Sequence, residues 1–464
     1  MSVDIEIRRE GADLVWASGL APAIAEIAVP VGPGVEVIVD AGDTSQVLSW
    51  RIEEGADPSA LARACTDSTV ADAVSRASTG AGDATLDSVT LTPSWARKAL
   101  VLAVERWSTR SLDEAVLVLD EAAAEQRTGN SLAAGRLVAL GSSVLEQLGT
   151  DCVEGDLTGG AAAELVDVSR FAAQAVEQTG WGHDIADIAA AVQAYSASDD
   201  TLVGAWIEME LDAIFGDLMV ATDYSTEVAA PVDKIDPASI PARILRWRGP
   251  DTFEIYARYR NDLDCVEVTV ELSAGVSADC FEANQLVAYA ADSSSGKLLA
   301  SGPMSGAGGQ VLMARLPLSE SHVRTALFGV YSTEVTAPVR IDPVSRTLLQ
   351  VDRLMLQAWD CHRAAVTVVH LADVHSGDAE LEAANRARTR FLRAAQSATD
   401  EALDELQQLV DEFLEEDPTI AGLLQARLEA IGRFGTSLQA GGSPVVGAHP
   451  LLAELLSAGY EDDE

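Results

Sequence analysis

YSTEVAAPVDKIDP, at residues 224–237, and YSTEVTAPVRIDP, at residues 331–343, are two copies of one stretch. They match at eleven positions when one residue is allowed as an insertion. The valines favour extended backbone, Pro231 and Pro338 supply no donor to a strand ladder, and the Asp-Pro ends suit a turn or a helix start. Because both copies fall where the hydrophobic period changes, we interpret them as structural joints. The alternative is a recognition or cleavage site that the chain presents twice.

Between the copies, apolar residues alternate with the period of two that is typical of strands. The strands are predicted at 242–248, 253–260, 265–272, 285–290, 297–300, 311–316 and 323–331. Seven strands at this spacing predict a β-sandwich-like domain over residues 223–343. The glycine-rich residues 301–309 are predicted to be a hairpin loop. They lack the following helix that a phosphate-binding loop requires.

The chain before the first copy begins with a β pattern. Residues 1–54 consist of short runs rich in valine and isoleucine, separated by turn residues, and predict a small N-terminal β unit. Residues 55–92 are rich in Asp, Ser, Thr and Gly, so we expect a connector with one short helix near 58–66.

A helical pattern then occupies residues 93–222. Pro93 suits the first turn of a helix, and the capping box Ser111–Glu114 opens another. Gly180 marks the end of a later helix. Six helices with brief links, the last at about 200–220, predict a helical bundle.

After the second copy the helical period returns. Residues 345–374 carry apolar side chains on nearly every side, which predicts a central, buried helix. Further helices are predicted at about 379–397, 400–416 and 418–434. Together they form a C-terminal helical bundle over residues 344–435. The sequence therefore indicates an α+β multidomain protein.

Residues 436–464 are predicted to be a linker and a short acidic terminal helix. Four leucines form one apolar edge of this helix: Leu451, Leu452, Leu455 and Leu456. The edge could dock on its own domain or in the groove of a partner protein. We favour docking on its own domain.

Charge and composition restrict the class of protein. The 464 residues carry a formal net charge of −42, spread along the whole chain. Such a surface repels nucleic acid and anionic membranes, and it favours solubility or a basic partner. Mimicry of DNA is a weaker alternative. Lysine occupies only positions 98, 234 and 297 among the 31 basic residues, which we interpret as the codon bias of a GC-rich bacterial genome.

The cysteines and the start of the chain indicate a compartment. Five cysteines without a C-x-x-C pair favour free thiols in a reduced, cytoplasmic setting. The sequence MSVDIEIRRE contains no basic-then-apolar leader, and no apolar run is long enough to span a membrane.

The histidines of the long predicted helix suggest a metal site: His362, His370 and His375, with Cys361, Asp373 and Asp378 nearby. Helix geometry separates His362 from His370 by about 12 Å along the axis, and only His370 with Asp373 could bind the same metal ion. Two ligands do not make a zinc site. A Cys152–His183 nucleophilic pair rests only on proximity in sequence. We expect no metal and no cofactor, and catalytic residues are not assigned.

An arginine-rich face is predicted on the first hairpin of the β domain. Strand alternation places five side chains together: Arg246, Arg248, Tyr256, Arg258 and Arg260. Guanidinium groups suit phosphate or another anion. The alternative that we favour is that these arginines form salt bridges with the acidic helical units of the same chain.

These patterns favour a non-catalytic protein-interaction protein, namely a scaffold, adaptor or regulatory subunit of a bacterial multi-protein system. The sequence contains no Walker A, G-x-S-x-G or H-E-x-x-H motif. A hydrolase with a dispersed His/Cys site is one alternative. A target or effector that is cut near the YSTEV copies by a partner protease is another.

Overall fold

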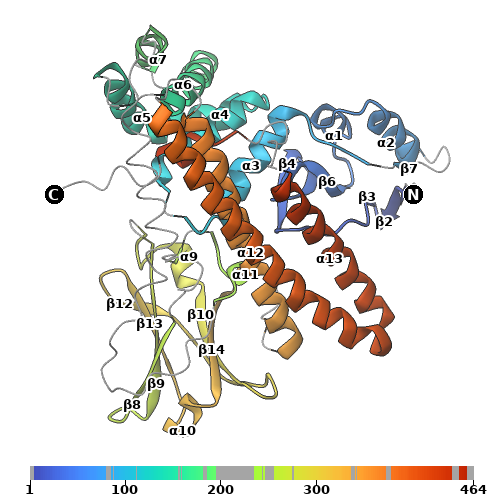
Figure 1. The fold of residues 1–464 in the computed structure, drawn as a ribbon, viewed down its shortest axis with the longest axis vertical. Coiled ribbons are helices and arrows are strands. Elements are labelled where there is room, and N and C mark those ends of the chain that lie inside the picture. The colour runs from blue at the N-terminus through green and yellow to red at the C-terminus, as the bar shows by residue number, and fades with distance from the viewer. Residues whose placement is uncertain are drawn as a thin grey trace. The chain divides into compact units, whose positions relative to one another are not determined.

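The chain folds into antiparallel sheets and helices, coloured from the N-terminus to the C-terminus in Figure 1. The computed structural model describes residues 5–79, 85–86, 88–110, 112–154, 157, 159–180, 185–194, 235–242, 244–245, 255–273, 276–335, 340, 342–372, 378–440 and 449–456. Packing divides the chain into two units. Unit 1 comprises Met1–Val104, Ser111–Leu211 and Ala358–Glu464, and unit 2 comprises Glu105–Arg110 and Asp212–Gln357.

The N-terminal part of unit 1 is a five-stranded antiparallel sheet in the order β2-β3-β6-β5-β4. Its strands are β2 Arg8–Glu10, β3 Asp13–Ala17, β4 Glu26–Gly32, β5 Val35–Asp40 and β6 Asp43–Ile52. In β4, Ile27, Val29 and Val31 are buried while the residues between them are exposed. Trp16 and Trp50, which are cross-strand partners, stack with ring centroids 6.4 Å apart. The sheet confirms the predicted N-terminal β unit.

Residues 55–92 contain more structure than predicted. Besides the expected short helix α1 (Ser59–Ala64) they form α2 (Thr69–Thr79) and β7 (Thr85–Leu86), which pairs with β1 (Ile5–Glu6). Helix α2 buries Val70, Ala73 and Val74, an i, i+3, i+4 set. The surrounding serine, threonine and aspartate residues conceal this pattern in the sequence.

The described residues that follow, up to residue 194, form five helices: α3 Pro93–Trp107, α4 Glu114–Arg127, α5 Ser131–Glu154, α6 Gly159–Thr179 and α7 Ile185–Ala194. Pro93 starts α3, and Gly180, with φ 73°, follows α6, as predicted. The cap of α4 differs from the prediction. Asp113 rather than Ser111 precedes the helix, and its carboxylate accepts from the N–H groups of Ala115 and Val116. The helix predicted at 200–220 lies outside the described residues.

The C-terminal helices are α11 (Pro343–Ala372), α12 (Asp378–Glu416) and α13 (Pro418–Gln439). Helix α12 is continuous, so the prediction of two helices meeting near residue 399 is wrong. Thr399 is buried inside α12 and its hydroxyl donates to the carbonyl of Ala395, a bond that lets threonine stay within a helix. Asp417 caps α13 by accepting from the N–H groups of Thr419 and Ile420.

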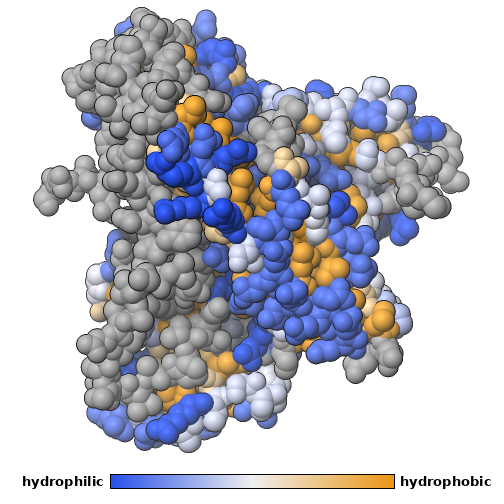
Figure 2. Space-filling view, viewed as in Figure 1, coloured by the Kyte–Doolittle hydropathy of each residue, from blue (hydrophilic) through white to orange (hydrophobic). Residues whose placement is uncertain are grey.

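Helices α12 and α13 pack against each other along a hydrophobic seam, and Figure 2 shows hydrophobic side chains between hydrophilic ones along this pair. Leu414 of α12 and Leu423 of α13, 62 % and 69 % exposed, lie on either side of the connection between the two helices. An apolar surface therefore remains in the outer part of this helix pair.

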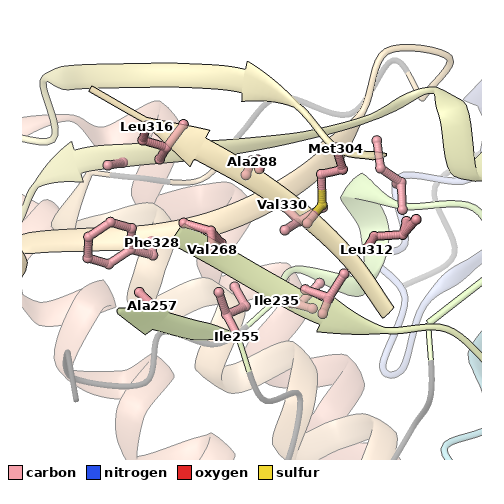
Figure 3. Close-up of a cluster of buried hydrophobic side chains, with 14 of the residues drawn as sticks. Ile235, Ile255, Ala257, Val268, Ala288, Met304, Leu312, Leu316, Phe328 and Val330 are labelled. Atoms are coloured by element: carbon pink, nitrogen blue, oxygen red, sulfur yellow. The ribbon is translucent and has the colours of Figure 1, made fainter. Parts of the chain in front are cut away.

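Unit 2 contains two antiparallel sheets around one core. Their orders are β11-β10-β14 and β12-β13-β9-β8. The strands are β8 Tyr256–Arg260, β9 Cys265–Glu271, β10 Leu286–Asp292, β11 Leu298–Pro303, β12 Ser305–Gly308, β13 Val311–Leu316 and β14 Ala326–Ser332. Both sheets contribute to one buried cluster, in which Figure 3 labels Val268, Leu312 and Phe328. The two sheets and their shared core confirm the predicted sandwich-like arrangement and, with the helices, the α+β fold class. Six of the predicted strands are present. Of the predicted strand 242–248, Leu245 forms an isolated bridge with Leu272, and residues 243 and 246–248 lie outside the described residues.

The glycine-rich residues 301–309 are not a loop. They complete β11 and form β12, where Ser305 pairs with Met313 of β13. Gly308 and Gly309, with φ 105° and 60°, then turn the chain into β13. The prediction failed because small residues carry no hydrophobic alternation, although their backbone pairs in a ladder.

The Asp-Pro ends of the two YSTEV copies have the same local structure. Asp236 precedes Pro237 at the start of a short 3-10 helix, η2 (Pro237–Ser239), and Asp342 precedes Pro343 at the start of α11. Each carboxylate accepts a backbone N–H from the first turn that follows it. The helix start predicted from Asp-Pro is thereby confirmed in both copies. Residues 224–234, 336–339 and 341 lie outside the described residues.

The two copies also contact each other within unit 2. Arg340 of the second copy donates to both carboxylate oxygens of Asp236 in the first, each at 2.7 Å, and to Asp352 of α11. Burial lowers the pKa of the Arg340 guanidinium, but the bonds and charges of the two aspartates outweigh burial and raise it. A bidentate ion pair thus joins the repeat ends.

Candidate functional site

The chain holds one of its own segments in a buried polar site within unit 1. We call residues 449–456 the terminal segment. Its helix α14 (Leu452–Leu456) packs against α4 and α6. The leucines predicted to dock all lie in it: Leu451, Leu452 and Leu455 are 3 % exposed or less, and Leu456 is partly buried. Ala453 and Glu454 are buried too, so the segment is enclosed on more than its apolar edge.

Four charged residues form what we call the docking site: Arg97 of α3, Asp120 of α4, Glu164 of α6 and Arg363 of α11. Arg97, 6 % exposed, donates to the backbone carbonyls of His449 and Pro450, the latter at 2.8 Å, and to the Glu164 carboxylate. Carbonyl oxygens are present in every peptide. The contacts of Arg97 with the segment are therefore independent of the segment's side chains.

Asp120 contacts the first turn of α14. Its Oδ1 accepts from the N–H of Leu452 at 3.0 Å, and its Oδ2 accepts from the N–H of Ala453 at 2.9 Å. Burial raises the pKa of Asp120 to about 7, although Arg97 and the two backbone donors lower it. Because both oxygens accept a hydrogen bond, the geometry is that of a carboxylate. The N–H groups that it binds are those that a helix start leaves unpaired.

Arg363 binds the one acidic side chain of the terminal segment. Its guanidinium donates to both oxygens of Glu454, with Nε 2.9 Å from Oε1. Arg363 is 3 % and Glu454 is 1 % exposed. Glu454 Oε2 also accepts from the N–H of Leu451 at 2.8 Å. The glutamate thus connects the segment's own backbone to α11.

These contacts form a capping box whose parts come from two places. In an ordinary capping box, a side chain at the N-cap binds the first-turn N–H groups, and a glutamate three positions later binds the N-cap N–H. Here Glu454 performs the second task, while Leu451, at the N-cap, has no polar side chain. Asp120 supplies the missing acceptor from α4. The helix start of α14 is therefore complete only in the docking site.

The docking site is supported by a second buried pair. Lys98, next to Arg97 on α3, binds Glu125 of α4 at 2.8 Å, and Glu125 also accepts from the Asn130 side chain. Both charged groups of the pair are nearly buried. The pair holds α3 against α4, so the guanidinium of Arg97 and the carboxylate of Asp120 are presented together.

The predicted arginine-rich face is only partly described. Tyr256 and Arg258 are exposed on β8, whereas Arg260 binds Asp262 and Glu267, each at 3.0 Å. Glu267 also binds Arg315 of β13. The partners of Arg260 therefore come from its own turn and the neighbouring strand. Arg246 and Arg248 lie outside the described residues.

The two described histidines of α11 pack against different rings. His362 packs edge-on against Phe434, with ring centroids 5.8 Å apart, and burial lowers its pKa to about 4. His370 lies against His449 with the same centroid distance. His375 and Asp373 lie outside the described residues. Among the described residues, no group of three His, Cys, Asp or Glu side chains could hold a metal ion.

All five cysteines are free thiols, and four of them are buried. Burial raises the pKa of the Cys152 thiol, and it raises that of Cys65 to about 12. A nucleophilic cysteine needs the opposite shift. His183, the other member of the pair considered from sequence, lies outside the described residues.

Sequence reasoning identified the leucines of the terminal segment but missed the docking site. Its signal in the sequence is faint: charged residues at buried positions of otherwise apolar helices, such as Arg97 within ARKALVLAV and Asp120 after AVLVL. A charge in such a position requires a partner. The partner itself lies more than 300 residues away.

Comparisons with known protein families, curated proteins and solved structures give no match to this chain. In the part of the chain that the structure describes, no helix is long and apolar enough to cross a membrane.

Proposed function

We propose that the chain is a non-catalytic protein-interaction protein, a scaffold, adaptor or regulatory subunit, which binds a short segment of a partner protein at the docking site. In this proposal the partner's segment replaces the terminal segment. The observation that carries it is the set of backbone contacts: Arg97 binds two carbonyls and Asp120 binds two N–H groups of a short apolar segment. The buried leucines of the segment add a second observation, because an apolar helix face in a groove is a common mode of peptide recognition.

The chemistry of the rest of the chain supports this proposal. The cysteines are free and mostly buried, which suits a reduced cytoplasmic setting. The net charge of −42 steers a basic partner towards the chain and discourages contact with nucleic acid or membranes. The partner would thus be a basic protein that carries a short apolar helix.

A competition experiment tests the proposal in the full chain. Residues 441–448 are replaced by the recognition sequence of a site-specific protease, and a fluorescein-labelled peptide with the sequence of residues 449–456 is the probe. Before cleavage the tethered segment competes at an effective concentration of about a millimolar, so fluorescence anisotropy should show weak binding. After cleavage the apparent affinity should increase by about tenfold or more, because the cut segment can diffuse away.

Two variants test whether the labelled peptide binds at the docking site. In the cut chain, Arg363→Met should weaken binding of the labelled peptide. Arg433→Met, which changes an exposed arginine of α13, should not. If the cut segment stays bound through gel filtration and the labelled peptide never enters, the segment is a permanent part of the fold and the proposal is wrong.

A further inference from the structure

Removal of the terminal segment would take hydrogen bonds from three buried charges of the docking site. Arg363 would lose both oxygens of Glu454, and Asp120 would lose the N–H groups of Leu452 and Ala453. Arg97 would lose two backbone carbonyls and keep the carboxylate of Glu164. A buried charge that loses hydrogen bonds is destabilised. A replacement ligand must therefore restore the contacts of Arg363 and Asp120.

We propose that the docking site selects partner segments of one chemical class: short apolar helices with a glutamate at the third helical position and free N–H groups at the first two. This inference rests on the proposed function and adds its specificity. Two residues determine this specificity: Arg363 binds the glutamate, and Asp120 accepts hydrogen bonds from the two N–H groups. The motif in the chain's own segment is Leu451-Leu-Ala-Glu-Leu455.

The glutamate is selected because it meets two donors at once. One of its oxygens accepts from the guanidinium of Arg363 and from the N–H of Leu451, 2.8 Å away, and the other accepts from Nε of Arg363. Glutamine has one acceptor oxygen, and its NH₂ group would face the guanidinium. Aspartate is one methylene shorter, so it cannot reach both donors from the same backbone position. The site therefore discriminates between acidic side chains as well as against neutral ones.

The residue at position 453 must be small and must keep its N–H. Ala453 is fully buried, and its N–H donates to Asp120. A proline or an ester linkage at this position removes the donor and leaves one oxygen of Asp120 unpaired. A large side chain would instead have to displace the helices that cover Ala453. Selection for the backbone N–H is thus separate from selection for the glutamate.

Synthetic peptides test both selections on the cut chain described above. The probes are the 449–456 peptide, the same peptide with Glu454→Gln, the same with Glu454→Met, and a depsipeptide with L-lactic acid in place of Ala453, which removes one N–H and keeps the side chain. Each changed peptide should bind at least about tenfold more weakly than the unchanged one, because each leaves one charged group of the site short of a partner.

Complementary variants of the chain should remove each preference. With Arg363→Met, the Glu454→Met peptide should bind better than the unchanged peptide, since an apolar pair replaces the ion pair and the glutamate of the unchanged peptide would lose its guanidinium partner. With Asp120→Ala, the depsipeptide and the unchanged peptide should bind with similar affinity. Circular dichroism of each variant establishes that it is folded.

The outcomes separate this inference from the proposed function. If no peptide binds the cut chain, the proposed function fails. If all four peptides bind with the same affinity, the site binds peptides but the specificity proposed here is wrong. If the preference for glutamate persists in the Arg363→Met variant, Arg363 does not read it and the assignment is overturned.

Discussion

Among single residues, the buried Asp120 and the partly buried His362 of unit 1 respond to pH in opposite senses. The pKa of His362 is lowered by burial from 6.5 to about 4, so an unfolded chain takes up this proton before the folded chain does. The pKa of Asp120 is raised by burial from 3.8 to about 7, so here the folded chain is protonated first. Acidification thus destabilises the fold through His362 and stabilises it through Asp120.

Replacement of His362 should remove its contribution to the pH dependence of stability. Between pH 6.5 and 4, the wild-type chain loses up to about 1.4 kcal/mol of unfolding free energy per pH unit through His362. His362→Leu removes this loss. On going from pH 7 to pH 5, its unfolding free energy should therefore rise relative to wild type by about 1–2 kcal/mol. Urea unfolding at both pH values measures the difference. Parallel pH profiles of the two proteins would contradict the assignment of a partly buried, neutral His362.

Among the elements, β10 and β14 show how a side chain of one strand can lie over a glycine of the neighbouring strand. Tyr289 of β10 lies directly opposite Gly329 of β14. A Cβ atom added to Gly329 would lie 2.1 Å from the tyrosine ring, far closer than two carbon atoms can approach. The ring of Tyr289 therefore occupies the space that a side chain at residue 329 would need.

Gly329→Ala should destabilise unit 2 by about 1–3 kcal/mol, because the ring or the strand must move. Gly302→Ala is the matched control in the same sheet. A Cβ atom there would meet its nearest neighbour at 3.5 Å, an ordinary contact. Thermal unfolding of both variants makes the comparison. Equal melting temperatures for the two would mean that Tyr289 does not lie against Gly329.

The sequence predicts elements where a hydrophobic period is strong. The alternation of β4 and the long, largely apolar helix α11 are found where expected. It fails where polar or small residues dilute the pattern, as in α2 and β12, and where a hydroxyl finds an acceptor inside a helix, as at Thr399. The docking site cannot be predicted from a hydrophobic period for another reason. Its contacts join residues far apart in sequence, and no local period encodes them.

In the molecule as a whole, acidic residues far outnumber basic ones. The sequence has 73 acidic residues against 31 Lys and Arg. Several basic side chains are already engaged in ion pairs of the fold, among them Arg97, Lys98, Arg340 and Arg363. The remaining surface is therefore strongly anionic, and mutual repulsion between its carboxylates opposes the folded state.

Salt should stabilise the folded chain. Raising the ionic strength from about 0.01 M to 0.15 M shortens the Debye length from about 30 Å to about 8 Å and screens this repulsion. The melting temperature should rise over that range by several degrees, and the rise should be similar for NaCl and KCl. Differential scanning calorimetry measures it. A melting temperature that falls with salt would mean that surface ion pairs outweigh the net repulsion.

The split capping box also fixes an order of events during synthesis. Leu452 follows its acceptor Asp120 by 332 residues. At roughly 5–20 residues per second, a ribosome reaches Leu452 some 15–65 s after it has made Asp120. The docking site is complete only once Arg363 has been made, 91 residues before its partner Glu454. At the same rate the terminal segment follows about 5–18 s later. A newly made chain thus passes through a period in which its docking site is open to any suitable peptide, before its own segment has been made.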